Sequence, residues 1–299
     1  MVDLCLAGTG GMMPLPQRSL TCFWLEYNGR AALIDCGEGT QVALEKSDLK
    51  LARLELILIT HTHGDHILGL PGLLLTLSNC GKTTPLTICG PKGMMHVING
   101  ICCVCPMFKF PVEVIEFTEE MNALDWNEFT VDILKMRHTM LRLGYRFTLN
   151  RLPIFDPHKA RENGIPQEYW QQLHRGDTVS IDGKTYTTAD VTMGERTPLI
   201  VTYMTDTVCF DEMADFAKNS DLMVCEGMYG DLDNVDKMMA RGHTVFSQAA
   251  ELACKANAKR LWLTHYSPAL TEPKKYQDSL TEIFEGAVVC DDGQKISIW

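Results

Sequence analysis

The stretch His61-Thr62-His63-Gly64-Asp65-His66 places four side chains that can bind a metal within six residues. A regular helix would put residues 61 and 63 on opposite sides, and a regular strand would put residue 66 on the face opposite to 61, 63 and 65. A strand that ends and turns into a helix can gather all four around one point. The flanking residues fit such a turn, because 54–60 (LELILIT) reads as a buried strand and an apolar run begins at Ile67.

The donor types of this stretch indicate its chemistry. Neutral imidazole and carboxylate are ligands of zinc and similar divalent ions. Four donors in one turn are too many for a single catalytic zinc ion, which takes three protein ligands, so they suit two metal ions completed by ligands from elsewhere. Chance surface histidines are the alternative, but three of the nine histidines of the chain fall within these six positions, beside an aspartate.

Three further metal-binding side chains follow apolar runs that read as strands: His138 after 131–136, Asp206 after 199–204 and His265 after 260–264. The ends of neighbouring strands present their side chains at one edge of a sheet, where ligands bind. Any one of these residues alone would more often be structural. Together, beside the histidine-rich turn, they favour one shared site.

Length and composition bound the class of protein. A chain of 299 residues with 45% hydrophobic and 22% charged residues is typical of a soluble globular protein with a sizeable core. We expect no signal peptide and no membrane span, because no basic start precedes an apolar run and the apolar runs are short. Twelve cysteines without a secretory signal predict reduced thiols in the cytoplasm. The cluster Cys102-Cys103-Val104-Cys105 is only part of a thiolate metal motif, so buried or helix-surface cysteines are the favoured interpretation.

The net charge of −11 argues against a general nucleic-acid binder, because affinity for nucleic acids comes largely from Lys and Arg on phosphates. A local basic patch, or metal ions that contact the scissile phosphate, would still allow an acidic protein to bind nucleic acid.

Strands and helices alternate along the chain in a pattern compatible with an αββα sandwich. A hairpin is expected around Asn28-Gly29, a strong turn signal. We expect strands at 2–7, 21–27, 30–34, 54–60, 86–89, 112–117, 129–136, 142–148, 199–203, 221–225, 259–264 and 295–298, and helices at 41–46, 66–78, 244–256 and 272–284. Residues 150–197 are rich in Pro, Gly and polar residues and read as an inserted arm. The prediction is therefore one α/β domain over residues 1–299 with an insertion at 150–197.

With these residues in view, the chain resembles the metallo-β-lactamase superfamily and, within it, the ribonuclease Z family, whose members trim the 3′ trailer from precursor tRNA. The match runs nearly end to end and rests on Gly8-Thr9-Gly10, Ile34-Asp35-Cys36-Gly37-Glu38-Gly39-Thr40-Gln41, the histidine-rich block, Gly69-Leu70-Pro71-Gly72-Leu73, Cys89-Gly90-Pro91-Lys92-Gly93 and Gly144-Tyr145-Arg146. The histidine-rich block indicates only the superfamily. The DCGEGTQ and GLPGLL stretches indicate the ribonuclease Z branch.

The resemblance implies a metallo-β-lactamase fold with an inserted arm and two zinc ions per chain. One zinc would be held by His61, His63 and His138, the other by Asp65, His66 and His265, with Asp206 bridging them. Asp65 would also accept the proton of the attacking water, and Asp35 would orient a ligand histidine. Glu226 and His243 match the family's pair that delivers a proton to the leaving oxygen, although a solvated carboxylate and an exposed loop histidine are the alternatives.

The implied reaction is hydrolysis of a phosphodiester by a metal-activated hydroxide that attacks phosphorus in line. The implied partners are precursor tRNA and a second copy of the chain, in a homodimer where one subunit's arm serves the other's site.

Some positions depart from the family pattern. Met204-Thr205 precedes Asp206 where Ser-Gly is usual, Cys225 and Gly227-Met228 flank Glu226, and Thr244-Val245 follows His243. Such neighbours of the ligands can change metal affinity or rate by roughly ten- to a hundredfold.

The arm is the larger departure. Residues 149–197 hold six Lys and Arg against seven Asp and Glu, so the arm should hold a phosphate backbone weakly. Tyr169 and Trp170 could stack on bases or anchor the arm. Two alternatives therefore stay open: a hydrolase of a small phosphodiester, and a non-catalytic metal-binding protein, which is disfavoured because no ligand is missing.

Overall fold

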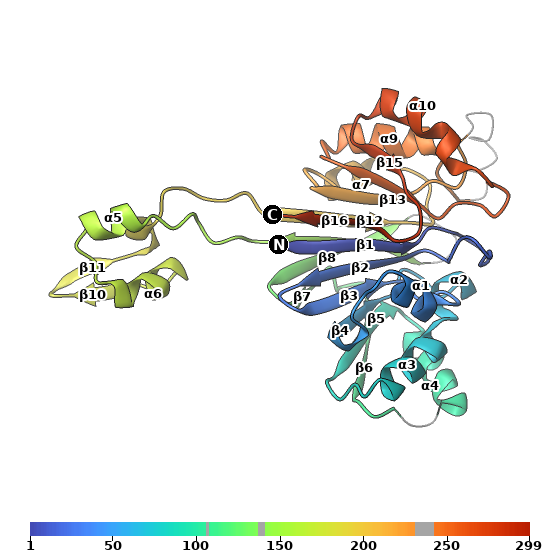
Figure 1. Cartoon of the computed structure of the whole chain (residues 1–299), viewed down its shortest axis with the longest axis horizontal. Helices are drawn as coiled ribbons and strands as arrows, with labels where there is room; N and C mark the ends of the chain where they lie inside the picture. Colours follow the sequence, from blue (N-terminus) through green and yellow to red (C-terminus); the bar gives the residue numbers. More distant parts are fainter. Residues whose placement is uncertain (106–107, 137–140, 231–241) are drawn as a thin grey trace. The chain divides into compact units, whose positions relative to one another are not determined.

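The structure is a computed structural model that describes residues 1–105, 108–136, 141–230 and 242–299 (Figure 1). The chain forms two units, one made of Met1–Phe147 with Ile200–Trp299 and the other of Thr148–Leu199. Each is described by itself.

The first sheet of the larger unit has the strand order β16-β1-β2-β3-β4-β5-β6. Its strands are β1 (Val2–Gly8), β2 (Cys22–Tyr27), β3 (Arg30–Ile34), β4 (Leu54–Leu58), β5 (Leu86–Pro91), β6 (Val112–Phe117) and β16 (Gln294–Ile298). The predicted hairpin joins β2 to β3, where Asn28 and Gly29 both adopt positive φ angles, 50° and 74°, as a tight hairpin turn requires. From β3 to β6 the strands are parallel, so β3, β4 and β5 end at one edge of the sheet.

The second sheet has the order β15-β14-β13-β12-β9-β8-β7. Its strands are β7 (Ala123–Trp126), β8 (Phe129–Met136), β9 (Arg142–Leu149), β12 (Leu199–Met204), β13 (Leu222–Glu226), β14 (Leu261–Thr264) and β15 (Ala287–Val289). The strands β12 to β15 are parallel, and β12, β13 and β14 are buried along their whole length, as expected for strands covered on both faces.

The two sheets pack face to face, with helices on their outer faces, so the predicted αββα sandwich is confirmed (Figure 1). Between the sheets, the Phe23 and Tyr203 rings lie 5.9 Å apart and Tyr145 Oη donates to the Ile59 carbonyl. The helices are α1 (Thr40–Lys46), α2 (Gly64–Ile67), α3 (Leu70–Asn79) and α4 (Met94–Val104) on the first sheet's side, and α7 (Asp211–Phe216), α9 (Phe246–Lys255) and α10 (Gln277–Ile283) on the second sheet's side; short 3-10 turns span Leu51–Arg53 and Pro273–Tyr276.

The helix predicted at 66–78 is in fact two helices, α2 and α3, which are separated at Leu68-Gly69. Gly69 causes the break, because its backbone lies against Gly37, where a Cβ would come within 1.9 Å of the carbonyl oxygen. The helix α4 was not predicted. It carries Cys102 and Cys103 on its exposed side, and Cys105 is buried just beyond its end, so the predicted buried and helix-surface cysteines are confirmed. Among the described residues, no helix has the length and apolar character needed to cross a membrane.

The smaller unit has a core of its own. It contains α5 (Pro157–Glu162), α6 (Trp170–His174), the hairpin β10 (Val179–Ile181) and β11 (Lys184–Tyr186), and 3-10 turns at Gln167–Tyr169 and Thr188–Val191. Its buried residues are Ala160, Ile165, Leu173, Val179, Tyr186 and Val191. Trp170 donates its indole N–H to the Ile165 carbonyl, and its ring lies 5.4 Å from Phe155. This tryptophan therefore packs within the unit, as expected of a residue that anchors the arm.

Candidate metal centre

The histidine-rich turn leads from β4 into α2, as predicted. His61 and His66 are fully buried, and His63 stands at the N-terminal end of α2 with its ring 4.6 Å from that of His61. Asp65 lies in the first turn of α2 and is partly exposed. The short helix therefore turns His66 back toward His61, whose ring centre is 4.1 Å away.

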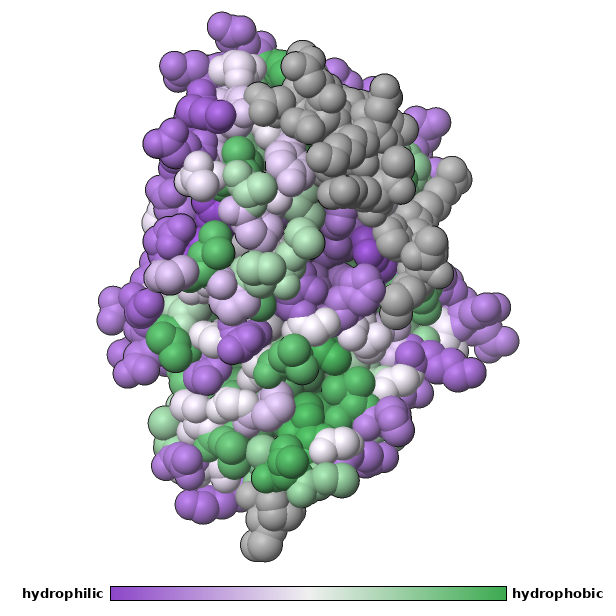
Figure 2. All heavy atoms as spheres, turned by 90° about the vertical axis from the view of Figure 1, so that its right-hand side faces the viewer, coloured by the Kyte–Doolittle hydropathy of each residue, from purple (hydrophilic) through white to green (hydrophobic). Residues whose placement is uncertain are grey.

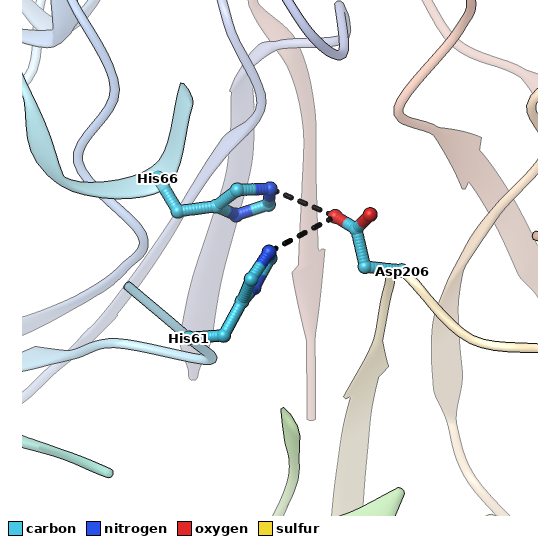
Figure 3. A group of neighbouring side chains, drawn as sticks. All are labelled: His61, His66 and Asp206. Atoms are coloured by element: carbon cyan, nitrogen blue, oxygen red, sulfur yellow. Dashed lines mark ion pairs between the residues drawn. The ribbon is translucent and has the colours of Figure 1, made fainter. Parts of the chain in front are cut away.

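The second sheet contributes donors from the ends of its parallel strands. Asp206 lies two residues after β12, and His265 directly follows β14; both are buried and both adopt positive φ angles, 56° and 60°. These turns bring the two side chains to the histidine-rich turn of the first sheet. Figure 3 shows His61 and His66 on one side, with both rings directed at the same Asp206 oxygen.

One carboxylate oxygen lies at the centre of the cluster. Asp206 Oδ2 is 2.8 Å from His66 Nε2, 3.0 Å from His265 Nε2 and 3.9 Å from His61 Nε2. Asp65 Oδ2 lies 3.5 Å from the Nε2 atoms of both His66 and His265. Of the predicted ligands, the structure thus brings six together, counting His63 on the cavity wall; His138 lies outside the described residues.

The cluster fits a divalent metal on its own geometry. The Nε2 atoms of His61, His66 and His265 and Asp206 Oδ2 are buried, and none has a hydrogen-bond partner among the described residues. Buried polar atoms are nearly always hydrogen-bonded, and leaving several unpaired in one place is costly. A cation between them would satisfy all four, and nitrogen with carboxylate oxygen is a donor set that zinc accepts.

Asp35 fixes the orientation of His66. Its Oδ2 lies 2.9 Å from His66 Nδ1, and its Oδ1 accepts a hydrogen bond from the Thr60 backbone N–H at 2.8 Å. With Nδ1 held by this carboxylate, the Nε2 lone pair of His66 is available to a metal. Asp35 is completely buried, and its φ of 62° turns it toward the site directly after β3.

Glu226 and His243 form a pair beside the cluster. Glu226 ends β13, between β12 and β14, and is completely buried, so the alternative of a solvated carboxylate is excluded. Its Oε2 lies 3.0 Å from His243 Nδ1 and 3.6 Å from His265 Nδ1, while its Oε1 accepts from the Thr207 backbone N–H. His243 is only partly buried and lines the cavity.

The charges of the cluster are strongly coupled. Burial acts to raise the pKa of Asp206, but His265 and His66 hold the pKa of this carboxyl well below its usual value. Burial acts to lower the pKa of His66, but Asp35 and Asp206 raise it well above the ordinary histidine value. Burial, with His66 nearby, lowers the pKa of His61 to about 2. At neutral pH His61 is therefore neutral and Asp206 ionised, the states in which they bind metals.

The cluster opens into a cavity of about 600 Å³. The wall residues near the cluster are His63, Asp65, Arg142, Asp206, His243 and His265, and the apolar residues are Met12, Met13, Pro14, Leu20 and Leu68. A volume of this order suits a small ligand or a nucleotide segment. Figure 2 views the side of the molecule at the right of Figure 1 and shows a continuous hydrophobic area beside hydrophilic residues.

Two contacts at this site were not predicted. The Met12 backbone N–H donates to Asp65 Oδ2 at 2.8 Å, and the Arg142 guanidinium contacts Asp206. A backbone donor leaves no trace in the side-chain sequence. Arg142 opens an apolar strand, and the sequence shows nothing that directs its charge inward.

Comparisons with known proteins agree with one another. A β-lactamase superfamily domain matches residues 30–266. The ribonuclease Z of Lachnospira eligens is 41% identical over 299 residues, which cover 100% of this chain and 98% of that protein. The ribonuclease Z of Clostridium acetobutylicum is 42% identical over 305 residues, with the same coverage. Among solved structures, the short form of human tRNase Z superposes with a TM-score of 0.69 at 25% identity, covering 99% of both chains.

Proposed function

Because the chain belongs to the ribonuclease Z family of the metallo-β-lactamase superfamily, we propose that it is a dizinc endoribonuclease that removes the 3′ trailer from precursor tRNA. The family and the fold predicted from the sequence are confirmed. The observation that carries the proposal is the meeting of unpaired buried donors from both sheets, with Asp206 Oδ2 at their centre and a cavity above them.

The proposed ligand sets follow the sequence prediction. His61, His63 and His138 would hold one zinc, and Asp65, His66 and His265 the other, with Asp206 between the two ions. When bound, the ions would lower the pKa of a water molecule and neutralise charge on the phosphate. The burial of unpaired Nε2 atoms on His61, His66 and His265 supports this assignment.

In this proposal Asp65 accepts the proton of the attacking water. Its Oδ2 faces the Nε2 atoms of His66 and His265 and is fixed by the Met12 backbone N–H. Burial acts to raise the pKa of Asp65, but the nearby His265 and His66 rings hold this pKa well below the usual value, so the carboxylate is ionised at neutral pH.

In this proposal His243 protonates the leaving 3′ oxygen. Glu226 Oε2 holds its Nδ1, which leaves Nε2 as the nitrogen free to exchange a proton with a group in the cavity. Burial acts to raise the pKa of Glu226, but the hydrogen bond with His243 holds this pKa below the usual carboxyl value, so Glu226 is ionised at neutral pH and holds the His243 ring in place.

The proposal extends to partners and location. Precursor tRNA is the substrate class that the relatives' names imply, and the Thr148–Leu199 unit would serve as the arm that contacts it. We place the protein in the cytoplasm, since all twelve cysteines lie in the described residues and are unpaired. A homodimer would cover exposed apolar residues on adjacent helices, Val42 on α1 and Leu75 on α3.

The zinc form of the purified protein should be incubated at low salt with a precursor tRNA and with bis(p-nitrophenyl) phosphate. We expect cleavage of the tRNA at the start of its 3′ trailer, and loss of cleavage with a chelator. Hydrolysis of the small ester without RNA cleavage would instead identify a hydrolase of small phosphodiesters. Bound zinc with no turnover of either substrate would identify a non-catalytic metal-binding protein.

A further inference from the structure

We propose that Arg142 is a positioning residue that holds one oxygen of Asp206 and so leaves only the other oxygen for the metal ions. This inference rests on the proposed function, because it concerns a ligand of the proposed metals.

The contact is built by neighbouring strands. Arg142 is the first residue of β9, which lies beside β12, and Asp206 follows β12 by two residues. Arg142 Nη1 donates to the Asp206 backbone carbonyl and lies 3.3 Å from Asp206 Oδ1. The guanidinium therefore holds this residue at two points, on its main chain and on its side chain.

The two oxygens of the Asp206 carboxylate face different groups. Oδ2 faces the Nε2 atoms of the three buried histidines and has no hydrogen-bond donor among the described residues. Oδ1 faces Arg142 and, at 3.7 Å, His243 Nδ1. A partial turn of the carboxylate out of this orientation would break the contact of one oxygen with the arginine and move the other away from the histidines.

Arg142 is an unusual residue to find here, because its cation lies beside a proposed site for further cations. Its side chain is only 2% exposed, and a guanidinium does not lose its proton in proteins. A buried cation needs an anionic partner, and Asp206 is the carboxylate within ion-pair distance among the described residues. Arg142 lines the cavity, but its side chain is almost completely buried and its Nη1 is taken up by Asp206, which favours a role in holding Asp206 over direct contact with a substrate.

The chain offers a matched control on the same strand. Arg146 lies four residues farther along β9, and its Nη1 donates to the carbonyls of Phe216 and Lys218 at 2.6 and 3.0 Å. It is not among the residues that line the cavity. Arg146→Met removes a guanidinium that is bound to main-chain oxygens without touching the metal centre.

The test compares wild type, Arg142→Met, Arg142→Lys and Arg146→Met by three measurements. These are zinc affinity by competition with a chromophoric chelator, the electron paramagnetic resonance spectrum of the dicobalt form, and kcat and KM for bis(p-nitrophenyl) phosphate. In Arg142→Met, zinc affinity and kcat should fall roughly 10- to 100-fold, the range for residues that orient metal ligands, with KM unchanged and the coupling between the cobalt ions altered. Arg142→Lys keeps the charge but loses the planar fork, so its values should lie between those of wild type and Arg142→Met. Arg146→Met should match wild type in all three measurements.

Two results would overturn the inference. One is an Arg142→Met protein with wild-type zinc affinity, spectrum and kcat. The other is a raised KM alone, which would mean that the arginine contacts the substrate. If Arg142→Met does not fold, the same comparison is made with Arg142→Lys. Zinc affinity and a spectrum unchanged from wild type in that variant would also overturn the inference. Wild type that binds no zinc would refute the proposed function instead.

Discussion

Asp65 is the residue whose loss should stop the reaction at least cost to the fold. Its carboxylate is partly exposed and contacts the site through His66, His265 and the Met12 backbone N–H. In Asp65→Ala, turnover of precursor tRNA should fall to background, while the melting temperature of the metal-free protein stays close to that of wild type. Activity near the wild-type level would contradict the role given to this carboxylate.

The loss of kcat on removal of His243 should be larger for a substrate with a poorer leaving group. The 3′ oxygen of a ribose needs a proton as it departs, whereas p-nitrophenolate departs without one. We expect His243→Ala to lose roughly 10²–10⁴-fold in kcat on precursor tRNA and far less on bis(p-nitrophenyl) phosphate, which single-turnover kinetics on both substrates would measure. Glu226→Gln should show the same asymmetry more weakly, because it removes the carboxylate that faces His243 Nδ1. Equal losses on both substrates would assign the pair a structural role.

At the scale of single residues, the sequence predicted the side chains that meet far better than the contacts that hold them. Asp206 and His265 could be found because each follows an apolar run that reads as a strand, and because several such residues beside one histidine-rich turn favour a shared site. The carboxylate Asp35 was found only through family resemblance. The contacts of Arg142 and of the Met12 backbone N–H could not be predicted. They depend on where a strand starts and on how a loop closes, and the residue types alone reveal neither.

At the scale of elements, the break between α2 and α3 depends on the close approach of two glycines. Gly69→Ala should destabilise the protein by about 1–3 kcal/mol, the range for overpacking, because the new Cβ would meet the Gly37 carbonyl oxygen. Gly100→Ala is the matched control, since Gly100 lies within α4 with open space around its Cβ position. It should be neutral or stabilising by about 0.5–1 kcal/mol. Guanidinium unfolding of the metal-free proteins measures both changes in stability. Equal effects of Gly69→Ala and Gly100→Ala would mean that close packing does not distinguish Gly69 from Gly100.

Sequence periodicity predicted the buried strands well and the helices less well. The strands β4, β12 and β14 are largely apolar runs that are buried throughout, apart from Glu55 of β4, and their ends leave little ambiguity. The helix predicted at 66–78 continues the apolar pattern through Leu68-Gly69, and only the tertiary contact of Gly69 with Gly37 shows why the chain bends there. The strands β7 and β15 at the two edges of the second sheet were not predicted, because β7 has a single buried residue, Trp126, and β15 is only three residues long.

At the scale of the whole molecule, many buried thiols should make stability fall in alkaline solution. Burial raises the pKa of Cys5 and of Cys209 to about 11 and that of Cys89 to about 12. In the unfolded chain a thiol ionises near pH 8.5, so above that pH the unfolded state loses protons that the folded state keeps. The contribution of each such thiol to the free energy of unfolding is fully present below pH 8.5. Between the unfolded and the folded pKa of the thiol, this contribution falls by roughly 1.4 kcal/mol per pH unit.

The measurement is guanidinium unfolding with a reductant at pH values from about 8 to 11. Cys89→Ala should lessen the slope of stability against pH, since Cys89 is completely buried in β5, whereas Cys80→Ser should leave the slope unchanged because Cys80 is exposed. A stability that stays constant over this range would contradict the burial of these thiols.

We propose that donors from two sheets converge to hold two zinc ions around Asp206. The decisive experiment is a crystal structure of the zinc form, with diffraction recorded above and below the zinc absorption edge. We expect two anomalous peaks flanking Asp206 Oδ2, within bonding distance of the Nε2 atoms of His61, His66 and His265. No peak there, or zinc bound only at a place remote from these side chains, would contradict it.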